Sequence, residues 1–454
     1  MSAAKYELDM CKGSIFKNII RFAFPLMLAN ILQLLYNAAD LVVVSRWAGN
    51  DAMASVGSTG ALTNLLINVF VGLSLGAGVV VSRRFGAQDN EGLYRAVHTS
   101  MFLGVLAGGL AFILGQFFSK PLLVLMGTPE GKVLDGAVLY MRIIFIGTPA
   151  VMVYNFGAAV MRAVGDTKRP LYILAISGAA NVALNLILVI GFGMGVEGVA
   201  IATAVSNYIS MFMVLYALVG ANSSYRLRLK ELKIYKEEFK EMVKIGLPAG
   251  LQGSVFSLSN TVVQSAVNSF GAVAMSGSAA GANIEGFVYT AMNSFYQAVV
   301  TSVSQNYGAK QEKRIYKSMW VSLMFVVAVG ALLGGFSVLF AEELLGIYIT
   351  DSAEAIAFGK IRMLITGLPY FLCGVMEVLT GTLRGLGYST ITAINSLLGA
   401  CGFRILWVFV ILPMNRLPET LFLCWPISWG IVVIMHLICF LIVRKKAIKR
   451  MYEV

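Results

Sequence analysis

Four polar side chains interrupt the first long apolar run of the chain at spacings that place them on one face of a helix. Asn30, Gln33, Asn37 and Asp40 all lie in the stretch NILQLLYNAAD. At about 100° per residue they fall within an arc of about 80°. A charge at the bilayer centre costs roughly 2.5–3.5 kcal/mol, so this face must meet protein or water. Either Asp40 binds a proton or cation in a wet cavity, which we favour, or it only bonds neighbouring amides.

The composition predicts the element that carries this stripe. Apolar residues make up 58% of the 454 and charged residues 13%, whereas a soluble domain has about 25% charged residues. Apolar runs long enough to cross a bilayer as helices recur along the whole chain. We therefore predict an all-α polytopic membrane protein with twelve transmembrane helices. The predicted spans are 15–44, 53–82, 93–118, 138–162, 169–191, 198–220, 241–269, 273–303, 316–343, 357–384, 389–412 and 421–443.

The basic residues predict the orientation of these spans. Most of the 35 Lys and Arg residues fall in segments that are cytoplasmic if both termini are cytoplasmic, as the positive-inside rule requires. The predicted outside loops hold only Arg46, Lys120, Lys132 and Arg416. Topology thus explains the net charge of +12, which is no sign of nucleic-acid binding. We predict a multi-pass protein of the plasma membrane.

The chain also repeats itself. RRFGAQDNEGLYRA (83–96) matches QNYGAKQEKRIYKS (305–318), and MRAVG (161–165) matches LRGLG (383–387), both at an offset of 222 residues; Pro25 matches Pro248 at 223. The offset is an even number of spans, which predicts two pseudo-symmetric six-helix bundles related as a parallel repeat. The predicted parts are an N-terminal lobe (1–220), a basic cytoplasmic linker (221–244) and a C-terminal lobe (245–454). Duplicated halves favour a carrier with a site near the midplane.

Polar stripes also occur on other predicted spans. We expect a substrate cavity lined by Asn30, Gln33, Asn37, Gln264, Glu285, Tyr289, Asn293 and Glu377. For any single Ser, Thr or Asn, packing between helices is the alternative role. Glu285 is expected to hold a cationic cargo, with Tyr289 offering a ring face. Glu377 and Arg404 lie on the tenth and eleventh spans. A structural ion pair between them is the alternative role for both residues.

Enzyme motifs in the sequence lack their context. Gly72–Gly76 fits a serine-hydrolase elbow and Gly193–Gly198 fits a dinucleotide-binding pattern. The first lies inside an apolar span without a preceding strand, and the second joins two spans without a βαβ unit. With two histidines in the chain, we see no convergent catalytic or metal-binding set. We expect no enzyme activity and no cofactor.

The sequence resembles the multidrug and toxic compound extrusion (MATE) family nearly end to end. The resemblance is carried by Pro25 with the N-x-x-D ending at Asp40, by the paired Gly-Ala loops at 86 and 308, and by the R-x-x-G turns at 162 and 384, within MRAVGDTKRP and TLRGLGYST. It implies two six-helix bundles forming a V-shaped cleft. It also implies export of cationic, amphipathic drugs in exchange for sodium ions or protons.

The resemblance further implies a cation-coupling site in the first bundle. The family's aspartate on the first span, its Asn and Asn or Asp on the fifth, and its Thr on the sixth are matched here by Asp40, Asn181, Asn185 and Thr203. Because position 185 holds Asn rather than Asp, the site has one carboxylate. NorM-like members carry a glutamate on the seventh span and an aspartate on the tenth, where this chain has Val255 and Cys373.

These observations together predict a secondary antiporter that exports organic cations by alternating access. The coupling ion is H⁺ or Na⁺. We favour the proton, because a single buried carboxylate binds a bare cation weakly and is readily protonated. The runner-up function is a lipid-linked saccharide flippase of the same wider superfamily. Its anionic cargo favours basic residues, whereas the deep carboxylates Asp40, Glu285 and Glu377 outnumber the one deep base, Arg404. The expected partners are the lipid bilayer and small cationic amphipathic substrates, with no nucleic acid and a monomeric state.

Overall fold

The computed structural model describes residues 6–48, 50–350 and 352–453, and no strand occurs in these ranges. The helices are α1 (Ile15–Val43), η2 (Val44–Ala48), α2 (Asn50–Gly86), α3 (Asn90–Leu125), α4 (Lys132–Ala163), α5 (Lys168–Asn185), η3 (Leu186–Gly191), α6 (Val196–Val219), η4 (Leu229–Glu231), α7 (Lys236–Asn268), α8 (Ala272–Gly308), α9 (Glu312–Leu339), α10 (Ala341–Gly346), α11 (Ala353–Gly367), α12 (Tyr370–Gly385), α13 (Ser389–Ser396), η5 (Leu397–Gly402), α14 (Phe403–Leu406), η6 (Trp407–Ile411), α15 (Leu412–Met414) and α16 (Pro418–Glu453). The predicted all-α class is confirmed.

Long helices match the predicted spans. Among the described residues, nine helices are long and apolar enough to cross a membrane, and the bent pair α11–α12 makes a tenth span. α7 and α8 contain 33 and 37 residues but are less apolar. Charges fill the first turns of α7, and α8 is rich in Ser, Ala, Gly and Asn. With these two, twelve long helical segments coincide with the twelve predicted spans.

One predicted span is bent. The tenth, expected over 357–384, is formed by α11 and α12, whose axes differ by 45°. The break lies between Gly367 and Tyr370 and contains Pro369, which has no N–H for a continuous helix. This bend was not predicted from the sequence.

The chain forms two compact units, which are described separately. Unit 1 comprises residues 6–9 and 28–250, and unit 2 comprises residues 10–27 and 251–453. α1 and α7 are therefore each shared, with the first part of α1 in unit 2 and the first part of α7 in unit 1. The predicted boundaries instead place the first part of α1 in the N-terminal lobe, and the first part of α7 in the linker (to 244) and the C-terminal lobe (from 245). As a functional division, the predicted boundaries stay a prediction.

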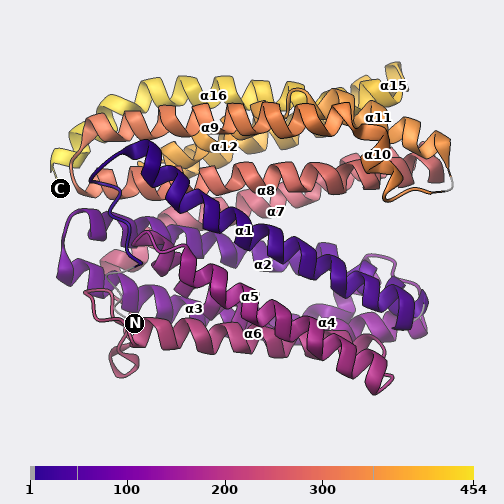
Figure 1. Cartoon of the computed structure of the whole chain (residues 1–454), viewed down its shortest axis with the longest axis horizontal. Coiled ribbons are helices and arrows are strands. Elements are labelled where there is room, and N and C mark those ends of the chain that lie inside the picture. The colour runs from indigo at the N-terminus through magenta and orange to yellow at the C-terminus, as the bar shows by residue number, and fades with distance from the viewer. Residues whose placement is uncertain (1–5, 49, 351, 454) are drawn as a thin grey trace. The chain divides into compact units, whose positions relative to one another are not determined.

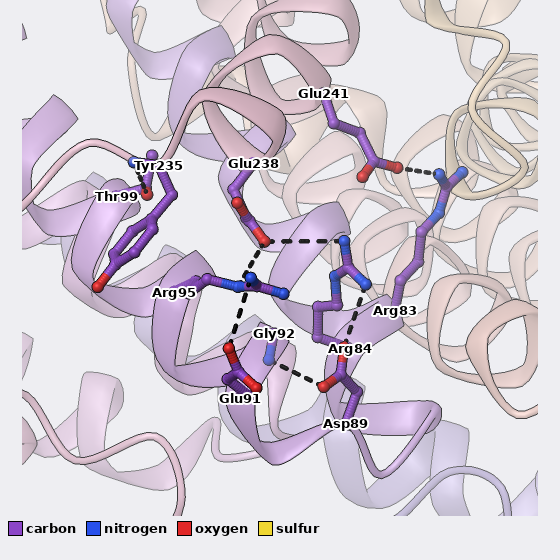
Figure 2. Close-up of polar contacts among 10 residues, drawn as sticks. All are labelled: Arg83, Arg84, Asp89, Glu91, Gly92, Arg95, Thr99, Tyr235, Glu238 and Glu241. Atoms are coloured by element: carbon purple, nitrogen blue, oxygen red, sulfur yellow. Dashed lines mark hydrogen bonds and ion pairs between the residues drawn. The ribbon is translucent and has the colours of Figure 1, made fainter.

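In unit 1, α4 packs against α2, α3 and α6 (Figure 1). The predicted linker between the halves belongs to this unit and lies over the start of α3. Glu238 is 1% exposed, and its Oε1 lies 3.4 Å from Arg95 Nε and 3.7 Å from Arg84 Nη2. Figure 2 shows Glu238 reaching between these arginines while the Tyr235 backbone N–H donates to Thr99 Oγ1 at 3.1 Å. The linker is thus a docked segment.

In unit 2, α8 packs against α9, α11 and α12 (Figure 1). The segment before α1 docks on the turn between α8 and α9. Arg314 Nη2 donates to the Met10 carbonyl at 2.8 Å and Nη1 to the Gly13 carbonyl at 3.0 Å. The Met10 backbone N–H donates to Gln305 Oε1 at 2.9 Å.

The internal repeat is confirmed at the level of the backbone. Gln88 and Lys310, related by the 222-residue offset, both have φ of 56° although neither is glycine. Such φ values are uncommon for residues with a Cβ. Gly165 and Gly387, related by the same offset, have φ of 85° and 91°. The two halves therefore fold their matching turns in the same way.

Small residues hold α2 close to the first part of α7 within unit 1. A Cβ added at Gly72 would lie 2.2 Å from Gly250 Cα, and one at Gly246 would lie 2.6 Å from Leu73 Cα. Close backbone approach through small residues four apart is a common device between membrane helices. This packing is the structural role of the Gly72–Gly76 motif.

We predict that Gly72→Ala lowers stability by about 1–3 kcal/mol, the usual cost of overpacking, because backbone atoms must separate. The measurement is the melting temperature of purified protein in detergent. Gly109→Ala on α3 is the matched control, since a Cβ there meets nothing within 4 Å. Equal melting temperatures for the two variants would contradict the packing account.

Candidate functional site

The second part of α1 packs on α5 because one residue of α5 lacks a side chain. A Cβ on Gly178 would lie 1.8 Å from the Tyr36 ring, so only glycine admits the ring at this place. The Tyr36 hydroxyl donates to the Ala175 carbonyl at 3.2 Å. This contact places Asp40, one turn after Tyr36, beside the polar face of α5.

The start of α5 is anchored separately. The Asp166 carboxylate accepts hydrogen bonds from the backbone N–H groups of Lys168 at 3.2 Å and Arg169 at 3.1 Å. Burial raises the pKa of the Asp166 carboxyl, and the Arg169 guanidinium opposes that shift. α5 is thereby held at its N-terminal end as well as along its length.

The four residues of the predicted cation-coupling site meet in one hydrogen-bonded chain in unit 1. Asn185 Nδ2 donates to Asp40 Oδ1 at 2.5 Å and to Asn181 Oδ1 at 3.3 Å. Asn181 Nδ2 lies 3.5 Å from Thr203 Oγ1, which donates to the Val199 carbonyl at 3.0 Å. The structure brings together α1, α5 and α6 as the residue types require; the ion-binding role stays a prediction.

The charge and one oxygen of this site are available for an ion. Asp40 is half-buried, and no Lys or Arg pairs with it in the part of the chain that the structure describes. Asn185 Oδ1 is buried and accepts no hydrogen bond. A buried acceptor without a donor is unfavourable unless a ligand or water completes it. The π-helix η3 begins directly after Asn185, and such irregular turns are frequent at functional sites.

A tyrosine that the sequence analysis did not select lies beside this site. Tyr140 on α4 is close enough to Asp40 for an electrostatic interaction, and it packs against a buried valine cluster that includes Val43 and Val199. No polar stripe marks Tyr140 in the sequence. Its place depends on α4 packing against α6, which sequence periodicity does not reveal.

The other α1 residues of the predicted cavity lie N-terminal to Asp40. Gln33 and Asn37 are exposed, and Gln33 Nε2 donates to Asn37 Oδ1 at 3.2 Å. Asn30 is half-buried. No hydrogen bond given by the structure joins Gln33 or Asn37 to Asp40 itself.

The predicted cavity residues of unit 2 do not form one group. Gln264 bonds along α7 to Asn268 at 3.0 Å. On α8, Asn293 Nδ2 lies 3.4 Å from the Tyr289 hydroxyl, and Glu377 of α12 acts electrostatically on Tyr289. The structure thus brings Tyr289, Asn293 and Glu377 together, and no hydrogen bond among the described residues joins Gln264 to them.

Glu285 has a partner that the sequence analysis missed. Arg362 Nη2 donates to Glu285 Oε2 at 2.8 Å and Nε to Oε1 at 3.2 Å. Thr366 donates to the same carboxylate, and Glu285 is 8% exposed. The charge is therefore already neutralised, which argues against the predicted role of Glu285 as the cargo anchor. The pair joins α8 to α11.

Two expectations about arginines need correction. The suggested Glu377–Arg404 ion pair is wrong, since Arg404 donates instead to Ser428 Oγ at 2.9 Å. Arg404 is also not the one deep base, because Arg362 and Arg384 are 8% and 7% exposed. Arg384 donates to the Tyr296 hydroxyl at 2.5 Å and to Gln252 Oε1 at 2.8 Å.

Comparison with known proteins agrees with this architecture. The MatE family model matches residues 25–187 and 248–410, one copy in each half of the repeat. The chain belongs to the MatE family. Members of this family are transporters, so the chain is a multi-pass membrane transporter and not an enzyme.

Several relatives are similar over most of their length. The "Probable multidrug resistance protein YoeA" of Bacillus subtilis is 28% identical over 415 residues, 89% of this chain and 89% of the relative. The "Probable multidrug resistance protein NorM" of Thermotoga maritima is 26% identical over 379 residues, 82% of this chain and 80% of the relative. The "Multidrug export protein MepA" of Staphylococcus aureus (strain NCTC 8325 / PS 47) is 22% identical over 427 residues, 93% and 91%.

Solved structures of MATE transporters share the fold. A structure described as the "outward-facing conformation of a multidrug resistance MATE family transporter of the MOP superfamily" matches with a TM-score of 0.88 at 21% identity, covering 98% of both chains. A "MOP superfamily transporter from Pyrococcus furiosus", described as having a binding pocket of reverse polarity, matches at 0.85 and 20% identity, covering 98% of this chain and 97% of that one.

We predict that Glu285→Gln destabilises this MatE protein by about 3–5 kcal/mol, because Arg362 is left buried without its counter-charge. Resistance to cationic and to neutral compounds should fall together, in proportion to the loss of folded protein. We would measure the melting temperature of the variant, its abundance in the membrane and the drug resistance of the same cells.

The matched control is Glu342→Gln in the same unit. Glu342 is exposed and pairs with Lys360 at 2.8 Å, and such a solvent-screened surface pair contributes little to stability. The cargo-anchor role of Glu285 would be restored if the Glu285→Gln protein kept the wild-type melting temperature and lost resistance to cationic compounds only.

Proposed function

We propose that this MatE protein is a secondary antiporter that exports organic cations in exchange for an ion bound at Asp40. The relatives named for multidrug resistance and multidrug export support the cargo class. The contact between Asp40 and Asn185 at 2.5 Å supports the place of coupling. We further propose that it works as a monomer in the plasma membrane with both termini cytoplasmic, as the distribution of basic residues predicts.

The physical basis of the exchange is competition for one negative charge. A proton on Asp40 removes the charge, whereas a sodium ion would use Asp40 together with the vacant acceptor Asn185 Oδ1. Either ion changes which hydrogen bonds the Asp40–Asn185–Asn181 chain can make. An ion that binds one conformation more tightly shifts the population toward it. We favour the proton, because one carboxylate compensates poorly for dehydrating a sodium ion in a low-dielectric site.

Efflux from vesicles that contain pure protein tests this proposal. A fluorescent organic cation is loaded, and either a proton gradient or a sodium gradient is imposed while the other ion is equal on both sides. Wild-type protein should expel the dye when the outside is made acidic, because protons that enter down their gradient drive the dye out. Asp40→Asn should insert normally and still bind dye, but its efflux should fall at least tenfold.

Asp135→Asn is the control, because Asp135 is an exposed carboxylate at the start of α4. It should follow the gradient like wild type. Efflux by Asp40→Asn that still tracks the imposed gradient would remove Asp40 as the coupling residue. Wild-type protein that responds to neither gradient would refute ion antiport altogether.

A lipid-linked saccharide flippase is the second candidate. It is favoured by three buried arginines of unit 2, Arg362, Arg384 and Arg404. Opposite them, Glu285 is buried and Glu377 is half-buried. An anionic cargo would need such bases. Movement of an anionic lipid analogue across the same vesicles, without movement of the cationic dye, would select this function.

A further inference from the structure

Arg404 lies in unit 2 without a carboxylate partner. It is 1% exposed, and no Asp or Glu of the described ranges lies within ion-pair distance of it. Buried charges usually require such a partner, as Arg362 has in Glu285. Something else must stabilise the Arg404 guanidinium.

Aromatic faces and neutral oxygens surround the guanidinium instead. Its carbon lies 4.0 Å from the Trp425 ring centroid and 5.9 Å from that of Phe256. Nε donates to Ser428 Oγ at 2.9 Å, and Nη1 lies 3.5 Å from Asn260 Oδ1. Ring faces with a few oxygens are the recognition chemistry of organic cations such as ammonium and guanidinium groups.

The repeat relates this position to the Asp40 site. At the 223-residue offset of Pro25 and Pro248, Asn260 on α7 is the counterpart of Asn37 on α1. At the 222-residue offset, Arg404 follows the counterpart of Asn181 by one residue. Each half therefore places a polar group of its first helix against its fifth span. Unit 1 has a carboxylate there, and unit 2 has a cation that belongs to the chain.

Irregular helical turns accompany both places. The π-helix η3 follows Asn185 in unit 1, whereas η5 and η6 flank Arg404 in unit 2. Val263, the counterpart of Asp40 at the 223-residue offset, is an apolar residue that is 3% exposed. The carboxylate position of unit 1 therefore has no charge in unit 2.

We propose that unit 2 contains a second cation-binding site, formed by Phe256, Trp425, Asn260 and Ser428, and that the Arg404 guanidinium fills it permanently. With the Arg404 side chain removed, the site should accept planar organic cations of guanidinium size. It neither loads nor releases an ion during the cycle. This last consequence rests on the proposed antiport, in which Asp40 then carries the exchangeable ion alone.

Chemical rescue tests the site directly. Arg404→Ala should lower the melting temperature of the detergent-solubilised protein. It should also reduce dye efflux at least tenfold. Guanidinium chloride at non-denaturing millimolar concentrations should restore at least half of both losses. Urea, a planar neutral analogue of the same size, should restore neither. Equal rescue by urea, or no rescue by guanidinium, would overturn the proposal.

Two further variants separate a cation site from a folding contact. In the Arg404→Ala background, Trp425→Leu should abolish the guanidinium effect, because the main ring face is lost. Arg404→Lys should retain more than half of the wild-type free energy of unfolding, whereas Arg404→Gln should retain less than half. Gln and Lys variants that behave alike would show that charge is irrelevant and would refute the site.

The thermal readout needs no transport. Rescue of stability in a protein that shows no ion-driven efflux would support the cation site while refuting the antiport. Ion-driven efflux by the wild type, with no guanidinium rescue of Arg404→Ala, would support the antiport and refute the cation site.

Discussion

A carboxylate inside a membrane helix must be compensated within the protein, and the Asn185–Asp40 hydrogen bond is the contact by which unit 1 meets this constraint. No Lys or Arg of the described residues pairs with Asp40, so an amide donor at 2.5 Å stabilises the charge without cancelling it. The Tyr36 ring packs on Gly178, where an added Cβ would lie 1.8 Å from it, and this contact supports the approach of α1 to α5. In the proposed antiport, the remaining negative charge binds the exchanged ion.

Unit 2 meets the same constraint in other ways. Glu285 and Arg362 cancel each other, whereas Arg384 rests on the Tyr296 hydroxyl and Gln252. Arg404 relies on ring faces and neutral oxygens. A duplicated chain has thus kept its turns and helix order, while unit 1 has a carboxylate on its first helix and unit 2 has a guanidinium on its fifth span, at positions that the repeat does not superpose. Such asymmetry suits a carrier in which one half exchanges an ion and the other remains fixed.

Sequence periodicity and motif resemblance were enough for most of the fold and for the Asp40 site. Helical spacing placed Asp40 on the polar face of the first span, and the resemblance supplied Asn181, Asn185 and Thr203 as its neighbours. Pairings between distant helices were less accessible. Arg362 lies 77 residues from Glu285, and which span faces α8 depends on packing that hydropathy does not encode. For the same reason Tyr140 was missed, Arg404 was paired with the wrong group, and the basic linker was not expected to dock through the buried Glu238.

Proton release on cargo binding tests most directly whether Asp40 is the exchangeable site. Purified protein in weakly buffered, sodium-free detergent solution is mixed with a permanently charged organic cation, and a pH indicator records the protons released. The account predicts one proton per carrier for the wild type and none for Asp40→Asn, with cargo still bound. The same release from Asp40→Asn would place the exchangeable proton elsewhere and contradict the account.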